Sequence, residues 1–275
     1  MIIAVDIGNS AAKAALVEGS TVLGSGRLDT SAASAADLLD GLRVLAGGAQ
    51  EMPSSIVAVS VVDRWTERLE RAASELELAL TVVAASHVPI STALVRPDRT
   101  GPDRLIAAWA AAAIHGTPVI VVDLGTATTV DAVDGDGFFL GGAILPGLAL
   151  AADSLAEGTA RLPRVELRLP DDAIGRDTTA ALQSGLLIGH IGAVRELVER
   201  MRARIGPAPA PGEPGARVVV TGGHSGAEWA QRAWREAAEP NLPAIADELD
   251  ADLVLRGLGL LAEHMASRPQ PQATS

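Results

Sequence analysis

Residues 119–131 read V-I-V-V-D-L-G-T-A-T-T-V-D, and this stretch decides the fold. The apolar, β-branched residues at its start predict a buried strand that ends in a tight turn carrying Asp123, Gly125 and Thr126. A second strand is expected over about 128–133. Gly125 lets the backbone approach a ligand closely, and consecutive N–H groups can point at anionic oxygens, so the turn suits a polyphosphate. Because Asp123 would repel a bare phosphate, we expect a cation between them.

The first residues of the chain repeat this arrangement. Residues 1–10 read M-I-I-A-V-D-I-G-N-S, an apolar strand followed by Asp6, Gly8, Asn9 and Ser10, and a return strand is expected over about 13–17. One such turn would also fit an ordinary hairpin whose Gly and Asn take positive φ. Two copies in one chain predict duplicated domains that face one cleft.

Composition limits the class of protein. A chain of 275 residues with 48% hydrophobic residues can hold two modest domains, and its sequence predicts neither a membrane span nor a secretory signal. The absence of cysteine excludes disulfides, Cys-ligated zinc and thiol catalysis, and fits a cytoplasmic protein. A net charge of −12 argues against nucleic acid or an anionic membrane as a partner. Since Lys13 is the only lysine, an anionic substrate would rely on arginines, backbone amides and metal.

Periodicity predicts helices and strands that alternate in each half of the chain. Helices are expected over 32–45, 65–80, 103–115, 146–158, 177–205 (one helix or two in tandem), 226–238 and 257–265. Further strands are expected over 56–62, 81–84, 138–140, 217–221 and 252–255. A Pro/Gly-rich connector spans 206–215. Since hairpins follow both D-x-G turns, we expect an α/β fold with mixed sheets, in domains 1–115 and 116–266 with a disordered tail at 267–275.

Residues 101–104, G-P-D-R, stand at the start of a predicted helix. Asp103 there could simply complement the helix dipole. Alternatively, it is a carboxylate base beside the guanidinium of Arg104. A kinase needs such a pair, since the carboxylate takes a hydroxyl proton and the arginine holds an anionic acceptor or the developing phosphoryl charge.

Other motifs leave two interpretations open. In G-R-D-T at 175–178, Asp177 or Thr178 could cap a helix, or the Thr178 hydroxyl could contact a substrate. The glycine-rich segment 141–147 and the T-G-G at 221–223 could be plain turns or could lie close to a nucleotide.

The sequence lacks the complete motifs of several common enzyme classes. Residues 223–226, G-H-S-G, have the strand–turn–helix context of a hydrolase nucleophile elbow, but the G-x-S-x-G spacing fails at Ala227. The histidines are scattered, without metal-ligand spacing. The chain has no G-x-x-x-x-G-K and no G-x-G-x-x-G after a strand, which removes P-loop and dinucleotide-binding interpretations.

Taken in order, these segments resemble type III pantothenate kinase, a member of the acetate kinase/sugar kinase/Hsp70/actin-like superfamily. The matching segments are D-I-G-N-S at 6–10, G-P-D-R at 101–104, D-L-G-T-A-T-T-V-D at 123–131, G-G-A-I-L-P-G at 141–147, T-A-R-L-P at 159–163, G-R-D-T at 175–178 and T-G-G at 221–223. The resemblance implies two ribonuclease H-like domains, each a mixed β-sheet flanked by helices as in actin-like ATPases. It also implies a homodimer, and ATP-dependent phosphorylation of pantothenate at its terminal hydroxyl, the first step of coenzyme A biosynthesis.

The resemblance assigns roles to particular residues. Asp103 would be the general base. Pantothenate contacts would come from Gly101, Pro102, Asp103, Arg104 and Thr178. ATP contacts would come from Asp6, Ile7, Gly8, Asn9, Ser10, Ala11, Ala12, Lys13 and Thr126. Asp123 would hold a monovalent cation, K⁺ or NH₄⁺, while Mg²⁺ would accompany ATP with Asp6 as an outer-sphere partner.

The chain departs from the family pattern at a few positions. Leu94 stands where the family usually has a tyrosine that contacts pantothenate, and Arg96 stands where it usually has an asparagine. Pro102 replaces a small residue, and Ser10 replaces a threonine but keeps the hydroxyl. Two alternatives stay open: a non-catalytic regulatory or accessory protein of the same family, and a kinase of the superfamily that acts on another hydroxyl compound.

Overall fold

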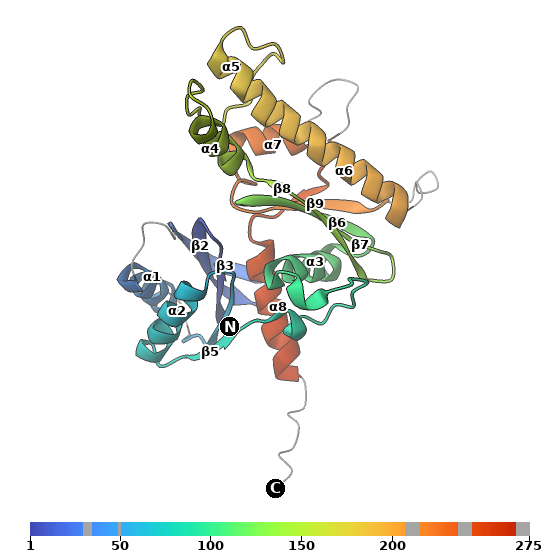
Figure 1. Ribbon diagram of the computed structural model, residues 1–275. Coiled ribbons are helices and arrows are strands. Elements are labelled where there is room, and N and C mark those ends of the chain that lie inside the picture. Colours follow the sequence, from blue (N-terminus) through green and yellow to red (C-terminus); the bar gives the residue numbers. More distant parts are fainter. Residues whose placement is uncertain (30–34, 49–50, 207–214, 236–243, 268–275) are drawn as a thin grey trace. The chain divides into compact units, whose positions relative to one another are not determined.

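A computed structural model describes residues 1–29, 35–48, 51–206, 215–235 and 244–267, and the chain divides into two compact units (Figure 1). Unit 1 comprises Met1–Pro89, Arg96–Ala110 and Asp252–Ser275, and unit 2 comprises Ile90–Val95 and Ala111–Ala251. The prediction divides the chain once, into domains 1–115 and 116–266. In the structure, by contrast, each compact unit is built from more than one segment of the chain. The predicted tail lies outside the described residues from residue 268 onward.

Unit 1 contains a five-stranded mixed sheet in the order β3-β2-β1-β4-β5. Its strands are β1 (Ile2–Ile7), β2 (Ala11–Glu18), β3 (Thr21–Asp29), β4 (Ser55–Ser60) and β5 (Ala79–Val82). The first three pair antiparallel as a meander, and β4 and β5 run parallel to β1. Ile3, Val5 and Ile7 alternate onto one face of β1, as the two-residue period of a strand requires, and are fully buried there.

Helices cover both faces of the unit 1 sheet. On one face α1 (Ala35–Gly47) and α2 (Asp63–Glu75) bury Leu38, Leu42, Trp65 and Leu69 in the same core as the strands. On the other side α8 (Leu253–Ser267) packs along β1, β2 and β4 (Figure 1). Short 3₁₀ turns at Ala85–His87 and Pro97–Arg99 precede α3 (Pro102–His115), which begins in unit 1.

Unit 2 repeats the topology of unit 1. Its strands are β6 (Val119–Leu124), β7 (Ala127–Val133), β8 (Phe139–Pro146), β9 (Arg217–Thr221) and β10 (Glu248–Leu249). Taken from β8 to β10, the order β8-β7-β6-β9-β10 matches β3-β2-β1-β4-β5 strand for strand, with the same parallel and antiparallel pairings. The predicted α/β fold, two ribonuclease H-like sheets flanked by helices, is therefore confirmed.

One face of the unit 2 sheet, with Ile120, Val122 and Val130, forms a single core with several helices (Figure 1). These are α4 (Leu148–Gly158), α6 (Gly189–Ile205), α7 (Glu228–Arg235) and the π-helix Ser184–Ile188. The π-helix joins α5 (Thr178–Gln183) to α6, so the predicted helical stretch 177–205 is one continuous run with a π segment inside it. None of the helices in the described part of the chain is long and apolar enough to cross a membrane.

Some predicted elements are wrong. Residues 252–255 were predicted as a strand, but α8 begins within them at Leu253. The predicted helix 65–80 ends at Glu75, and β5 begins at Ala79. Pro146 ends β8 rather than starting a helix, and β3 was not predicted at all. Most of the predicted connector 206–215 falls on residues 207–214, outside the described residues.

Candidate active site

The hairpin of β1 and β2 carries all eight predicted ATP contacts of unit 1. Asp6 and Ile7 end β1, the Gly8 N–H donates to the Ala11 carbonyl at 2.9 Å, and Asn9 and Ser10 are exposed at the tip. Lys13 lies directly opposite Asp6 in the ladder of β1 and β2, so the two side chains share one face of the sheet. The hairpin therefore presents a carboxylate, an ammonium group and exposed polar side chains at one place.

The turn after β6 is built in the same way in unit 2. The strands β1 and β6 have the same burial pattern, with Asp6 and Asp123 as the half-buried fifth residue of each. The Gly125 N–H donates to the Ala127 carbonyl at 3.2 Å and leaves Thr126 exposed at the tip. The structure thus places Asp123 and Thr126 on one turn, as predicted.

Two glycines from distant segments pack against this second turn. Gly222 follows β9 with φ of 94°, and a Cβ there would collide with Asp123 Oδ1 and the Leu124 backbone. A Cβ on Gly147 would collide with the carbonyls of Gly125 and Thr126, and the Gly147 N–H donates to the Thr126 carbonyl at 3.0 Å. Both glycines belong to motifs noted in the sequence, but their contacts with the Asp123 turn could not be predicted without the β6–β9 pairing for Gly222 and the β7–β8 pairing for Gly147.

Ser225, in the G-H-S-G segment, is an internal structural group. It is only 1% exposed, and its hydroxyl donates to the Gly222 carbonyl at 2.7 Å. A hydrolase nucleophile must reach a substrate. Ser225 is therefore not placed as a hydrolase nucleophile would be, in agreement with the sequence analysis.

Asp103 stands in the first turn of α3, where the helix dipole favours a negative charge. A Cβ on Gly101 would collide with Asp103 Oδ1, so the carboxylate folds back over a glycine that leaves room for it. Asp103 and Arg104 are both half-buried. The segment thus combines a carboxylate and a guanidinium at an accessible helix start, which fits both the dipole interpretation and the general-base interpretation.

The segment before Gly101 is organised by a bidentate ion pair. The Arg96 guanidinium donates from Nε to Asp98 Oδ1 at 3.1 Å and from its NH2 nitrogen to Oδ2 at 2.9 Å. This hydrogen-bonded guanidinium lowers the pKa of the Asp98 carboxyl. Arg96 is therefore engaged with Asp98, across the Pro97–Arg99 turn that leads to Gly101.

Thr178 is the first residue of α5 and is exposed. Asp177, not Thr178, caps this helix, because its Oδ1 accepts a hydrogen bond from the Ala180 N–H at 2.8 Å. A Cβ on Gly175 would collide with the backbone of Ala180 and Ala181, so the loop approaches the helix closely. The Thr178 hydroxyl is not needed for the cap.

Leu94 lies in the segment of unit 2 that pairs with Phe139 at the start of β8. The Ala93 N–H donates to the Phe139 carbonyl at 3.1 Å, and the Phe139 N–H donates to the Ser91 carbonyl at 2.8 Å. A Cβ on Gly141, which has φ of 100°, would stand 3.0 Å from Leu94 Cδ2. Leu94 therefore makes an apolar contact with a glycine of the 141–147 motif.

A partly buried polar pair supports the strand that leaves the Asp123 turn. Thr128, 1% exposed on β7, has its hydroxyl 3.0 Å from His190 Nε2 on α6. Burial lowers the pKa of His190, which favours the neutral imidazole. Neither residue was singled out in the sequence, because the pair joins positions far apart in the chain.

The protein side chains alone do not form a metal cage. Among the described residues, no group of three or more His, Asp, Glu or Cys side chains could hold a metal ion. Mg²⁺ is usually held by one or two carboxylates together with substrate phosphates, and Asp6 at the end of β1 fits that pattern. Asp123 offers a single carboxylate, which packs so closely against Gly222 that a Cβ at that glycine would collide with its Oδ1.

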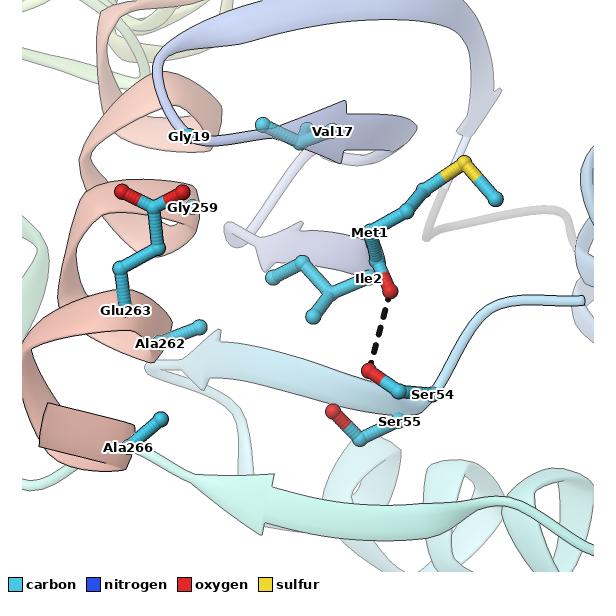
Figure 2. A pocket seen from close by; sticks show the side chains of 10 residues that line it. All are labelled: Met1, Ile2, Val17, Gly19, Ser54, Ser55, Gly259, Ala262, Glu263 and Ala266. Atoms are coloured by element: carbon cyan, nitrogen blue, oxygen red, sulfur yellow. Dashed lines mark hydrogen bonds between the residues drawn. The ribbon is translucent and has the colours of Figure 1, made fainter. Parts of the chain in front are cut away.

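A cavity in unit 1 lies away from these residues. It has a volume of about 230 Å³ and is lined at the starts of β1 and β4 by Met1, Ile2, Ser54 and Ser55, and on α8 by Gly259 and Glu263 among others (Figure 2). The predicted site residues of the first hairpin lie at and beyond the opposite end of β1, and no predicted site residue lines the cavity. We therefore do not assign the cavity to the active site.

Comparison with known proteins agrees with this geometry. A sequence model of the type III pantothenate kinase family matches residues 2–200. A type III pantothenate kinase from Rhodospirillum centenum is 33% identical, covering 98% of this chain and 100% of the relative, and one from Rubrobacter xylanophilus is 36% identical, covering 98% and 99%. A crystal structure from Campylobacter jejuni, assigned to the Baf family of transcriptional activators, has a TM-score of 0.60 at 19% identity, covers 97% of this chain and 100% of its own, and bears on the fold alone. With the two matching turns and these relatives together, the chain belongs to the type III pantothenate kinase family.

Proposed function

We propose that the protein transfers the γ-phosphoryl group of ATP to the terminal hydroxyl of pantothenate, the first step of coenzyme A biosynthesis. The observation that carries this proposal is the duplicated turn: Asp6 and Asp123 end equivalent strands with identical burial patterns, and a glycine-containing turn follows each. Such turns suit polyphosphate, and membership of a pantothenate kinase family supplies the acceptor. A regulatory relative without activity would be expected to have lost these turns.

The proposed chemistry is a direct in-line transfer. Asp103 accepts the proton of the pantothenate hydroxyl, and Arg104 holds the anionic acceptor beside it. Gly101 and Pro102 complete this substrate segment, and the exposed hydroxyl of Thr178 adds a further contact. The turn residues 6–13 and Thr126 bind the phosphates through backbone N–H groups, hydroxyls and the Lys13 ammonium group.

Two cations belong to the proposal. Mg²⁺ bound with ATP would neutralise charge on the transferred phosphoryl group, with Asp6 as its outer-sphere partner. K⁺ or NH₄⁺ would be held by Asp123, whose carboxylate lies in the space left by Gly125 and Gly222. Asp123→Asn should therefore remove any stimulation of turnover by K⁺ while turnover in its absence is little changed.

A homodimer and a cytoplasmic location complete the proposal. Gly185, Gly189 and Gly192 are exposed, and a Cβ at any of them meets no atom of the described residues within 4 Å beyond the helix's own backbone. Among the described residues, these glycines therefore do not pack closely against another element, and the proposed dimer places a helix of a second copy against them. Gly189→Arg should shift the mass measured by light scattering from dimer to monomer, whereas Ser74→Arg, which adds the same charge at an exposed position of α2, should not.

The direct test is identification of the product. Purified protein is incubated with ATP, Mg²⁺, K⁺ and pantothenate, and with a panel of other hydroxyl compounds, and the products are identified by mass spectrometry. Phosphopantothenate as the dominant product is the expected result. Phosphorylation of another compound instead would refute the proposed substrate and direct attention to Leu94. No phosphorylation of any compound would favour the accessory-protein alternative.

A further inference from the structure

His224 makes two hydrogen bonds to one carbonyl of the Asp123 turn. Its backbone N–H donates to the Leu124 carbonyl at 3.2 Å, and its side-chain Nδ1 lies 3.2 Å from the same oxygen. Leu124 lies between Asp123 and Gly125 and is 2% exposed. Both lone pairs of this carbonyl can therefore be satisfied by one residue that is 100 positions away in the sequence.

The chemistry of the acceptor fixes the protonation of Nδ1. A carbonyl oxygen can only accept, so Nδ1 must carry a hydrogen and donate it. The cationic imidazolium also carries a hydrogen on Nδ1. The bond to Leu124 is therefore available in either charge state of the ring.

The backbone around His224 is held in place by its own hydrogen bonds. The Ser225 hydroxyl and N–H both donate to the Gly222 carbonyl, at 2.7 and 3.2 Å. The Ala227 N–H donates to the His224 carbonyl at 3.1 Å, and Gln231 Nε2 donates to the Ser225 carbonyl at 3.4 Å. A side chain on so constrained a turn can fix the position of the carbonyl that it contacts.

This contact extends the sheet where the β6–β9 ladder ends. β9 pairs with β6 as far as Thr221 opposite Asp123, and Gly222 then turns the chain with its positive φ. His224 thus gives Leu124 a partner one residue beyond the last strand pair. Without its imidazole, one of the two hydrogen bonds that His224 makes to the Leu124 carbonyl is lost.

We infer that His224 is a positioning residue for nucleotide binding: its Nδ1–H holds the Leu124 carbonyl and thereby the turn that presents Asp123, Gly125 and Thr126. This inference rests on the proposed function, because it assigns the Asp123 turn to ATP. It uses the imidazole as a fixed donor and not as an acid, a base or a metal ligand.

The test compares three substitutions by calorimetric titration with ATP and Mg²⁺. His224→Ala removes the donor. His224→Asn places an amide N–H close to the position of Nδ1, whereas the amide of His224→Gln corresponds to Nε2. His87→Ala is a matched control, since His87 Nδ1 accepts one hydrogen bond, from the Ala84 N–H at 3.2 Å, on an exposed turn of unit 1.

The inference predicts that His224→Ala and His224→Gln raise the Kd for ATP about 3- to 10-fold, as expected for the loss of one hydrogen bond. His224→Asn and His87→Ala should stay within about twofold of wild type. Thermal unfolding of each variant identifies any general loss of structure. If replacement of His224 caused such a loss, the His224→Asn variant would not be expected to recover ATP affinity. Unchanged affinity in His224→Ala, or rescue by Gln and not by Asn, would overturn the inference.

The same titration separates this inference from the proposed function. If wild type binds ATP but does not phosphorylate pantothenate, the proposed substrate is refuted and the comparison of ATP affinities still decides the role of His224. If His224→Ala raises the KM for pantothenate while the Kd for ATP is unchanged, the positioning role is refuted and the kinase assignment stands.

Discussion

Gly222 allows no side chain, for two independent reasons. Its φ of 94° is unfavourable for any L-residue, and a Cβ would collide with Asp123 Oδ1 and the Leu124 backbone. We predict that Gly222→Ala lowers the free energy of unfolding by about 1–3 kcal/mol. Urea denaturation measures the change, and ATP affinity should fall as well because Asp123 must move.

Gly226 is the matched control for that substitution. It is exposed, and a Cβ there meets no atom of the described part of the chain within 4 Å. Gly226→Ala should change the free energy of unfolding by less than about 0.5 kcal/mol. Equal effects at the two positions would contradict the assignment of a special role to Gly222.

His190 makes stability depend on pH. Burial lowers its pKa, so the unfolded chain binds this proton more readily than the folded protein does. The contribution of the neutral His190 ring to the free energy of unfolding is therefore fully present above the ordinary histidine pKa of 6.5. It is lost as the pH falls toward the lowered pKa of the folded protein.

The contribution of His190 can be isolated with a variant that does not titrate. His190→Gln keeps an amide for Thr128, so the loss of unfolding free energy between about pH 7.5 and about pH 5.5 should be smaller in the variant than in wild type. Urea denaturation at the two pH values gives this difference. Equal losses in both proteins would show that His190 does not titrate in this range.

Single elements differ in how well the sequence predicts them. β1 and β6 were predicted because four consecutive apolar residues precede an Asp-x-Gly turn in each. β3 was missed because it is a largely exposed edge strand containing Gly24 and Gly26, so it has no apolar alternation to detect. The start of α8 was mistaken for a strand because a short, fully buried apolar run does not distinguish the two structures.

The helix α8 approaches the sheet closely at Gly259. A Cβ there would collide with the Gly19 carbonyl in the β2–β3 turn, and Arg256 Nε donates to the Ser20 carbonyl of that turn at 3.0 Å. Helix propensity alone predicts that Gly259→Ala stabilises the protein by about 1 kcal/mol. We predict the opposite sign, a loss of about 1–3 kcal/mol in urea denaturation, because the packed turn cannot move away freely. A gain in stability would show that α8 is free to shift.

For the whole molecule, duplication made the candidate site predictable. Two D-x-G turns could be identified in the sequence because each lies within one hairpin, and the structure places residues 6–13 on the first and Asp123 and Thr126 on the second. The residues that support the second turn, Gly147, Gly222 and His224, were not assigned to it. Their contacts depend on strand pairings and loop approaches between distant segments, which local sequence patterns do not encode.

The most direct test of the kinase assignment is a coupled ADP-release assay of wild type and Asp103→Asn with Mg²⁺ and K⁺, each with and without pantothenate, beside a titration of ATP binding. We predict ADP release by wild type only when pantothenate is present, and no turnover by Asp103→Asn although it binds ATP with unchanged affinity. ADP release that does not need pantothenate would contradict the proposed acceptor. Undiminished turnover in Asp103→Asn would contradict the role of this carboxylate as general base.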